Sequence, residues 1–440
     1  METVFLERED NLVNTMDILR KELDLTEKDV QHIQTHSLPT ILSYPRSELR
    51  KRILVYKQEL LLTTGEIKKM VLRDSRMLRT DSLKTKRLLD VLKEELDIDR
   101  QDVSYMLQKE LLLLTYNAEE NIRPTIQYLL KGSLGTCLGV VERKGVSTLL
   151  LEDDQEEEKN QIVRERLKAL VMGHPKVLSS SLERNLKPTV DFFLSDVGLS
   201  ELEFGKVMYR RGGTLLEANV ERTLMAKVDF LRRELGLELE DEGDDCGPTL
   251  EEISWDGQVK LDAPLSSSKN DNDNEIAHKL SNYEKTRLLA QMIATAPDIL
   301  TLSIDNNLKP KFDYFRKKLN FTKEQLQYVI MKRPQLLALN LDRNIIPKVE
   351  FFLQERQPVG FGTVADKYEG GLGMTMDEIR EWIVLFPQTL TFVLESRIRS
   401  RTLDVVKYDL QVGDEDGMAP MNFISRNEPS WKKWIEANVC

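Results

Sequence analysis

The sequence of 440 residues predicts an all-α protein, a right- or left-handed superhelical solenoid of about eight helix-pair repeats joined by short 3-10 turns. Three observations predict this fold. A Pro-x-x-Leu-x6-Asn-x-x-Pro pattern recurs in clear and weaker copies, whose uninterrupted intervals are 36 or 37 residues, and helix-capping motifs recur in the same frame. No segment shows the sustained alternation of apolar and polar residues that marks a β-strand, so we expect a sheet content near zero.

The repeated pattern is clearest in three copies, which begin at Pro175, Pro297 and Pro334. Each copy continues to an aromatic cluster such as Phe192-Phe193. Weaker copies have their first position, here called the anchor, at residues 39, 75, 111, 212 and 387. The longer intervals between anchors contain insertions. A solenoid tolerates insertions because each repeat touches only its neighbours.

Within the copy that begins at Pro175, each element can be predicted in order. The anchor and Leu178 form a tight turn whose leucine enters the core. Asn185 is interpreted as the cap of the next helix, which Gly198 ends as a glycine after the last helical turn should. A second helix then starts at Ser200. The equivalent leucines and asparagines of the other two clear copies are Leu300, Leu337, Asn307 and Asn344.

Capping boxes predict the start of the second helix in each repeat. In this motif a Ser or Thr hydroxyl accepts a backbone N–H of the first turn, and a Glu or Gln three residues later reaches back to the cap. Each cap is worth on the order of 1 kcal/mol. The motif occurs at Thr63, Ser200, Thr322 and Thr375, with acidic variants at Thr26 and Asp99.

The repeats and the insertions divide the chain into eight predicted segments. They are an N-terminal half-repeat or cap (1–37), repeats 1–3 (38–151), an acidic insert (152–160), repeats 4–5 (161–237), an acidic linker (238–278), repeats 6–7 (279–357), a glycine-rich insert (358–373), and the last repeat with a C-terminal cap (374–440).

Charge is distributed unevenly along the chain. The formal net charge is -11, but Glu152–Glu158 carries six acids and no base, and Glu238–Glu275 carries a net charge of -11. The repeats are therefore mildly basic, with a net charge of +6. The acidic segments are interpreted as solvated loops, and as an alternative they could cover a basic groove and compete with phosphate groups.

Basic residues recur beside the anchors and the repeated asparagines. Because stacked helix pairs are about 10 Å apart, one cation per layer could follow a phosphate backbone. The alternative is that each cation complements the dipole of a helix end. Tyr209, Tyr328 and Phe386 could stack on bases, although aromatic residues at helical spacing are more often core. The candidate nucleic-acid-binding residues are Arg73, Arg76, Arg123, Arg184, Lys187, Arg210, Arg211, Arg222, Lys309, Lys332, Arg333, Arg343, Arg397, Arg399 and Arg401.

The sequence favours neither catalysis nor a bound cofactor or metal. Gly360-x-Gly362-x-x-Ala365 loosely matches a dinucleotide fingerprint but lacks a βαβ context. The three cysteines and four histidines have no metal-binding spacing, which also fits a reducing compartment. No stretch approaches the roughly 18 apolar residues of a membrane span. We expect a non-enzymatic protein, without membrane contact, that is a monomer.

The Pro-x-x-Leu-x6-Asn-x-x-Pro spacing, the aromatic cluster that follows it and the run Val197-Gly198-Leu199-Ser200 together resemble the mitochondrial transcription termination factor (mTERF) family. The resemblance extends over residues 24–401. It implies a superhelix of helix pairs with a basic groove for double-stranded DNA or RNA, and a role in organellar gene expression such as transcription termination or RNA processing.

Two functions remain open from the sequence. One is a nucleic-acid-binding regulator in a mitochondrion or chloroplast, although the N-terminal residues do not look like a transit peptide. The other is a scaffold that binds a protein partner on its concave face, which the small basic excess and the acidic inserts would suit.

Overall fold

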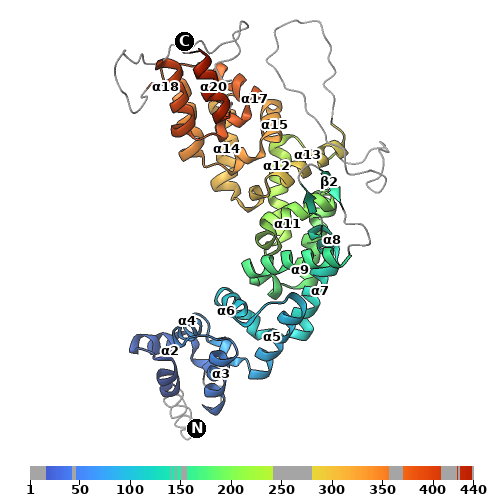
Figure 1. Cartoon of the computed structure of the whole chain (residues 1–440), viewed down its shortest axis with the longest axis vertical. Helices are drawn as coiled ribbons and strands as arrows, with labels where there is room; N and C mark the ends of the chain where they lie inside the picture. The colour runs from blue at the N-terminus through green and yellow to red at the C-terminus, as the bar shows by residue number, and fades with distance from the viewer. Residues whose placement is uncertain are drawn as a thin grey trace. The chain divides into compact units, whose positions relative to one another are not determined.

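The computed structural model describes residues 16–41, 46–139, 141–143, 146–149, 156–240, 280–355, 370–407, 424 and 427–438 (Figure 1). Nearly all of these residues are helical, which confirms the predicted all-α class. The chain forms two compact units, residues 1–220 and 221–440, and each is described by itself. Short 3-10 and π-helical turns are labelled η.

The first unit holds the helices of the earlier repeats and one β-hairpin. Its elements are α2 (Glu27–Ile41), α3 (Arg46–Gln58), α4 (Thr64–Arg73), η1 (Ser75–Arg79), α5 (Ser82–Leu96), α6 (Arg100–Lys109), η2 (Leu111–Thr115), η3 (Ala118–Ile122), α7 (Arg123–Lys131), α8 (Ser133–Leu138), β1 (Val141–Arg143), β2 (Val146–Leu149), α9 (Glu156–Gly173), η5 (Pro175–Ser179), η6 (Leu182–Leu186), α10 (Lys187–Asp191), η7 (Phe192–Asp196) and α11 (Glu201–Leu216).

The second unit holds the later repeats and begins within η8. Its elements are η8 (Val220–Met225), α12 (Ala226–Leu235), α13 (Asn282–Thr295), η9 (Pro297–Thr301), η10 (Ile304–Leu308), α14 (Lys309–Asp313), η11 (Tyr314–Lys318), α15 (Lys323–Lys332), η12 (Pro334–Ala338), η13 (Leu341–Ile345), α16 (Ile346–Leu353), α17 (Met376–Leu385), η14 (Pro387–Thr391), η15 (Leu394–Arg399), α18 (Ser400–Lys407) and α20 (Glu428–Asn438).

Six of the eight predicted anchors begin a 3-10 turn, at residues 75, 111, 175, 297, 334 and 387. The leucine of each clear copy is buried, with Leu178 and Leu300 each 1% exposed and Leu337 fully buried. The anchors at 39 and 212 do not form turns. Pro39 lies within α2, and Gly212 lies within α11.

The first helix of each clear repeat starts with a wide π-helical turn that the sequence did not predict. The backbone N–H of Leu186 donates to the carbonyl of Ser181, five residues earlier (3.1 Å), and Leu308 and Ile345 do the same in their repeats. The caps are therefore Ser181, Ser303 and Asn340, whose side chains accept first-turn N–H groups. The interpretation of Asn185, Asn307 and Asn344 as caps was wrong, because the wide turn moves the helix start four residues earlier.

The predicted caps of the second helices are confirmed. Complete capping boxes form at Thr63, Ser200, Thr322 and Thr375, and the Asp99 side chain accepts the N–H of Asp102. A further box at Ser281 begins α13. These local contacts explain why the helices begin where the sequence predicts.

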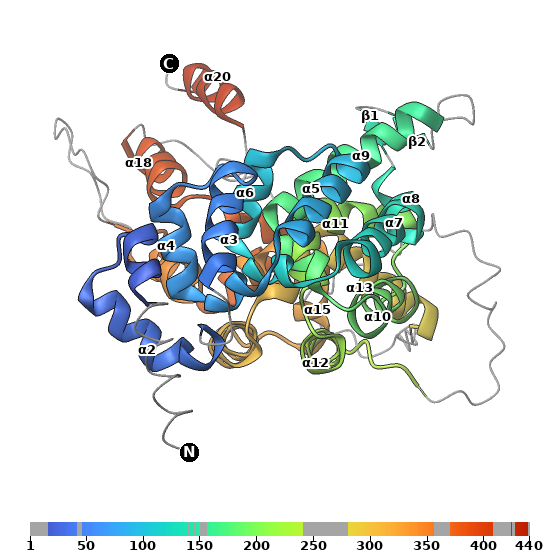
Figure 2. The same ribbon diagram turned by 90° about the horizontal axis from the view of Figure 1, so that it is seen from below.

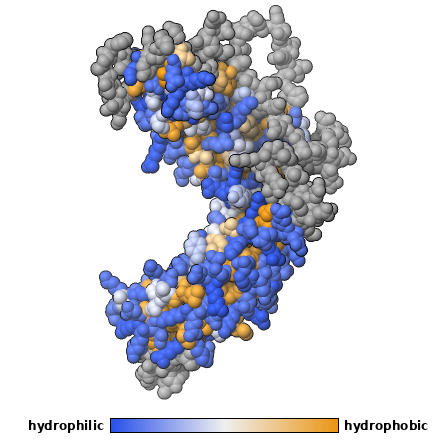
Figure 3. All heavy atoms as spheres, in the orientation of Figure 1, coloured by the Kyte–Doolittle hydropathy of each residue, from blue (hydrophilic) through white to orange (hydrophobic). Residues whose placement is uncertain are grey.

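Helix packing buries a continuous apolar core in each unit. In the first unit, α5, α7 and α9 lie side by side and contact one another (Figures 1 and 2). Phe193 and Phe204 join the two helices of the repeat that begins at Pro175, with ring centroids 5.7 Å apart. Hydrophilic residues predominate on the face of each unit that Figure 3 shows. No helix of the described residues has the length and apolar character needed to cross a membrane.

The insertions differ in part from their predicted structure. A short antiparallel hairpin, β1–β2, pairs Val141 with Leu149 and Arg143 with Val146, so sheet is present where the sequence predicted almost none. Its β-branched valines favour strand. Residues 156–160 of the acidic insert are helical, as the start of α9. The linker after residue 240 and residues 356–369, which include Gly360, Gly362 and Ala365, lie outside the described residues.

Candidate nucleic-acid interface

The 3-10 turns lie against one another within each unit. In the first unit η1 contacts η2, which contacts η5, and in the second η9 contacts η12, which contacts η14. We call each series a turn column. Some of the predicted cations lie directly before a turn of these columns. Arg73 comes just before η1, and Lys332 and Arg333 come just before η12.

Ten of the fifteen predicted nucleic-acid-binding residues are exposed, namely Arg73, Arg76 and eight others. Arg184 and Arg343 occupy the same place in their repeats. Their backbone N–H groups donate to the caps Ser181 (3.2 Å) and Asn340 (2.7 Å), while their side chains are exposed. The structure shows no ion-pair partner for either guanidinium among the described residues. The eight exposed cations are Arg184, Arg210, Arg211, Arg222, Lys309, Lys332, Arg333 and Arg343.

Arg73 and Arg76 are also exposed, but both bind other groups of the protein. Arg73 donates to the carbonyls of Gln108 and Leu107 (3.3 Å for the latter), at the C-terminal end of α6. Arg73 thus complements the dipole of a helix C-terminus in the neighbouring repeat, which is the alternative role that the sequence allowed for these cations. The Arg76 guanidinium binds both carboxylate oxygens of Asp74, and this contact lowers the pKa of Asp74 and raises the pKa of Arg76.

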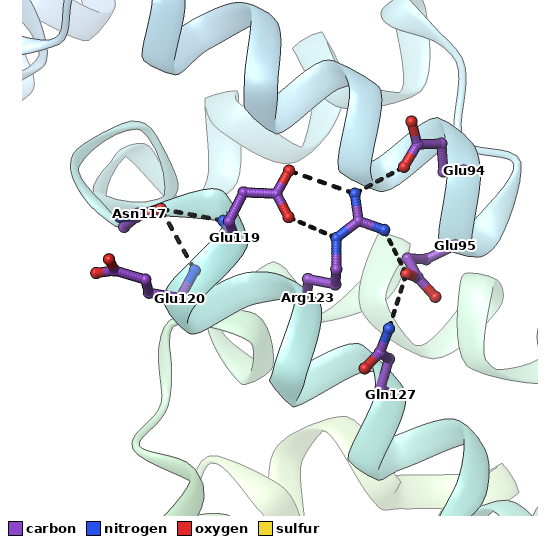
Figure 4. A network of polar contacts seen from close by, with 7 residues as sticks. All are labelled: Glu94, Glu95, Asn117, Glu119, Glu120, Arg123 and Gln127. Atoms are coloured by element: carbon purple, nitrogen blue, oxygen red, sulfur yellow. Dashed lines mark hydrogen bonds and ion pairs between the residues drawn. The ribbon is translucent and has the colours of Figure 1, made fainter.

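Arg123 is the centre of an ion-pair network (Figure 4). Its Nη1 lies 2.6 Å from Glu95, its Nη2 lies 2.6 Å from Glu94, and its Nε lies 2.7 Å from Glu119. These hydrogen bonds raise the pKa of the guanidinium, with Glu119 contributing most. Three carboxylates compensate one cation, so the local charge is negative and unfavourable for a phosphate group.

The remaining predicted cations are half-buried or buried. Lys187 pairs with Glu183 (2.6 Å), and Arg399 pairs with Glu395 (3.1 Å). Arg397 lies over the Phe392 ring, 3.9 Å from its centroid, and donates to the carbonyl of Ile424 (3.0 Å). Burial lowers the pKa of Arg397.

Arg401 is 3% exposed. It donates to the Ile424 carbonyl (3.0 Å) and to Glu428 (2.9 Å), and so holds the C-terminal helix α20 against the last repeat. Trp431 of α20 is also buried and donates to Asp404 (3.1 Å), as expected of a C-terminal cap.

A set of buried lysines was not predicted from the sequence. Lys311 and Lys348 are 1% and 2% exposed, and each donates from Nζ to the carbonyl of the Pro-x-x-Leu leucine in the following repeat. Lys227 does the same to Leu300. Burial lowers the pKa of all three amines. The recurring Pro-Lys pairs at Pro310-Lys311 and Pro347-Lys348 are the signal that could have revealed them.

Residues 264–361 match the family model of mTERF. The family resemblance predicted from the repeat is thereby confirmed for this part of the chain. No curated protein matches the chain.

Proposed function

We propose that this chain, which carries an mTERF domain, binds nucleic acid through the exposed cations of its repeats and thereby regulates organellar transcription or RNA processing. The observation that carries the proposal is the recurrence of exposed cations at equivalent places in different repeats. Arg184 and Arg343 follow equivalent caps, and Arg210, Arg211, Lys332 and Arg333 precede equivalent anchor positions.

Physical chemistry supports these residues over the other predicted cations. A cation contributes to nucleic-acid affinity by neutralising a phosphate and releasing a condensed counterion. A guanidinium that already faces carboxylates, as Arg123 does, gives less net attraction, and a buried one such as Arg401 cannot reach a phosphate. We propose the eight exposed cations as the contact set on the ground of their exposure: Arg184, Arg210, Arg211, Arg222, Lys309, Lys332, Arg333 and Arg343.

The proposal predicts contacts with the backbone of the nucleic acid rather than with base edges. Phosphate contacts position a protein on its ligand without reading sequence. The cations lie on helices and turns that pack on the core of their unit, and six of them recur at equivalent positions of the repeat. Such an arrangement suits a ligand with a regular chain of charges.

Salt-dependent binding of the full chain tests the proposal. Fluorescence anisotropy with labelled duplex DNA, duplex RNA and single-stranded RNA should show affinity that falls steeply as salt rises, with log K decreasing by about 0.7–0.9 per neutralised phosphate for each log unit of salt. The double variant Arg333→Gln with Arg343→Gln should weaken binding and lower the salt slope by about 2.

The matched control is Lys317→Gln. Lys317 has a 73% exposed side chain in the same unit, pairs with Asp313 and was not among the predicted contacts. This variant removes one charge and should leave the slope nearly unchanged. Absence of salt-sensitive binding to all three probes would reject the proposal and favour a protein-binding scaffold.

A further inference from the structure

The first unit contains a cleft of about 450 Å³ between α8, α9 and α11. Its lining includes Arg166, His174, Tyr209, Arg210 and Arg211, and none of the described residues that line it is acidic. Its size falls in the range of small-molecule sites. A cleft with several cations and an aromatic ring attracts a ligand that is both anionic and planar.

Tyr209 is the most exposed aromatic residue of this cleft. It is 73% exposed, more than any other large apolar or aromatic residue in the described part of the chain. Arg166 lies over the ring, with the guanidinium carbon 5.7 Å from the ring centroid. Arg166 is itself positioned by a hydrogen bond from Nη1 to the carbonyl of Leu138 (2.6 Å). The ring therefore has a cation over one face and is widely open to water.

The anchor position of this repeat, Gly212, does not form a turn and lies within α11. Where other repeats turn, α11 continues to Leu216, and this places Tyr209, Arg210 and Arg211 along a helix instead of at its end. Gly213 has no space for a side chain, since a Cβ there would lie 2.0 Å from the His174 ring. The close approach of α11 to His174 thus shapes one wall of the cleft.

We infer that this cleft binds an unpaired nucleotide, with the base stacked on Tyr209 and the adjoining phosphates beside Arg210 and Arg211. Stacking requires a base whose face is uncovered, which a continuous duplex does not offer and a single strand does. The inference rests on the proposed function and narrows its ligand to single-stranded nucleic acid at this place in the chain.

Substitution of Tyr209 in the full chain tests the inference. The probe is a single-stranded RNA that contains 2-aminopurine, whose fluorescence falls when the base stacks. Tyr209→Ala should weaken binding of this RNA about tenfold, in line with the contribution of one stacked base, and should remove the quenching. Tyr209→Phe keeps the ring and should retain both. Duplex affinity should stay the same in both variants.

Tyr105→Ala is the matched control. Tyr105 is 50% exposed in the same unit and has Lys109 over its ring at 4.3 Å, but it does not line the cleft. This variant should bind the RNA as the wild type does. Because Tyr209 is so exposed, its replacement should leave the unfolding transition unchanged, which excludes loss of folding as an explanation.

The results that would overturn the inference about Tyr209 differ from those that would overturn the proposed function. If Tyr209→Ala binds the RNA with unchanged affinity and quenching, or if it weakens single-strand and duplex binding equally, the inference is overturned. Salt-sensitive binding that still depends on Arg333 and Arg343 would then leave the proposed function standing. Absence of binding to every probe would overturn both.

Discussion

Lys348 donates a hydrogen bond from Nζ to the backbone carbonyl of Leu390, 2.6 Å away, and so joins one repeat to the next. The amine is buried and also donates to the side-chain oxygen of Asn344. Lys311 makes the equivalent bond to Leu337, also at 2.6 Å. Each bond satisfies a carbonyl at the end of a Pro-x-x-Leu turn. The lysines thus set how successive repeats of the second unit stack.

The pH dependence of stability tests the role of Lys348. Burial lowers the pKa of its amine from the ordinary value of 10.5 to about 8. Between these values the unfolded chain binds a proton that the folded chain has lost, so stability should rise with pH across this window. Below about pH 8 both states are protonated and the contribution is constant.

Lys348→Met removes this titration. The difference in unfolding free energy between wild type and variant should grow in favour of the wild type from about pH 7 to about pH 10. Urea unfolding followed by tryptophan fluorescence would measure it, since Trp382 packs on Phe352 in the same unit. A difference that does not change with pH would contradict the assignment of the shifted pKa to Lys348.

Leu300→Ala should destabilise the protein by about 2–5 kcal/mol, because it leaves a cavity where a 1% exposed leucine fills the space between repeats. Val393→Ala serves as the control. Val393 is 62% exposed, and its truncation should change stability by less than about 0.5 kcal/mol. Chemical denaturation of both variants gives the comparison, and equal effects would mean that the turn leucine is not a core residue.

Gly213→Ala should be destabilising by about 1–3 kcal/mol, since the new methyl group would meet the ring and the Cβ of His174 at 2.0 and 2.5 Å. Gly173→Ala is a fitting control, because Gly173 ends α9 and a Cβ added there would have no atom within 4 Å. Thermal unfolding should show a lower midpoint for the first variant alone. The same shift in both would argue against close helix contact at Gly213.

Arg123→Gln should affect stability more than nucleic-acid binding. The change leaves Glu94, Glu95 and Glu119 close together without their shared cation, and we expect a loss of about 1–2 kcal/mol. Binding should weaken less than in Arg343→Gln, whose guanidinium is exposed. Denaturation and anisotropy on the two variants would check both parts, and a larger binding defect in Arg123→Gln would place this residue in the contact set.

The sequence by itself determined the helix-pair repeat and the starts of its second helices. The capping box at Ser200 depends on Glu203, three residues away, and the turn at Pro297 depends on the proline ring and Leu300. Interactions of this kind lie within one helical turn, so residue types and spacing are enough to predict them. The same holds for the buried leucines, because a repeated apolar position in a solenoid faces the same core.

Only the tertiary structure decided which cations are open to a ligand and which hold the fold. Arg123 meets Glu94 and Glu95, 29 and 28 residues earlier in the chain, and Lys348 reaches a carbonyl 42 residues later. Tyr209 is exposed on α11, although its helical spacing favoured a core position. The sequence around a charged or aromatic residue does not indicate which distant residue it contacts. The role of such a residue is set by the packing of repeats, which brings together residues that the sequence separates.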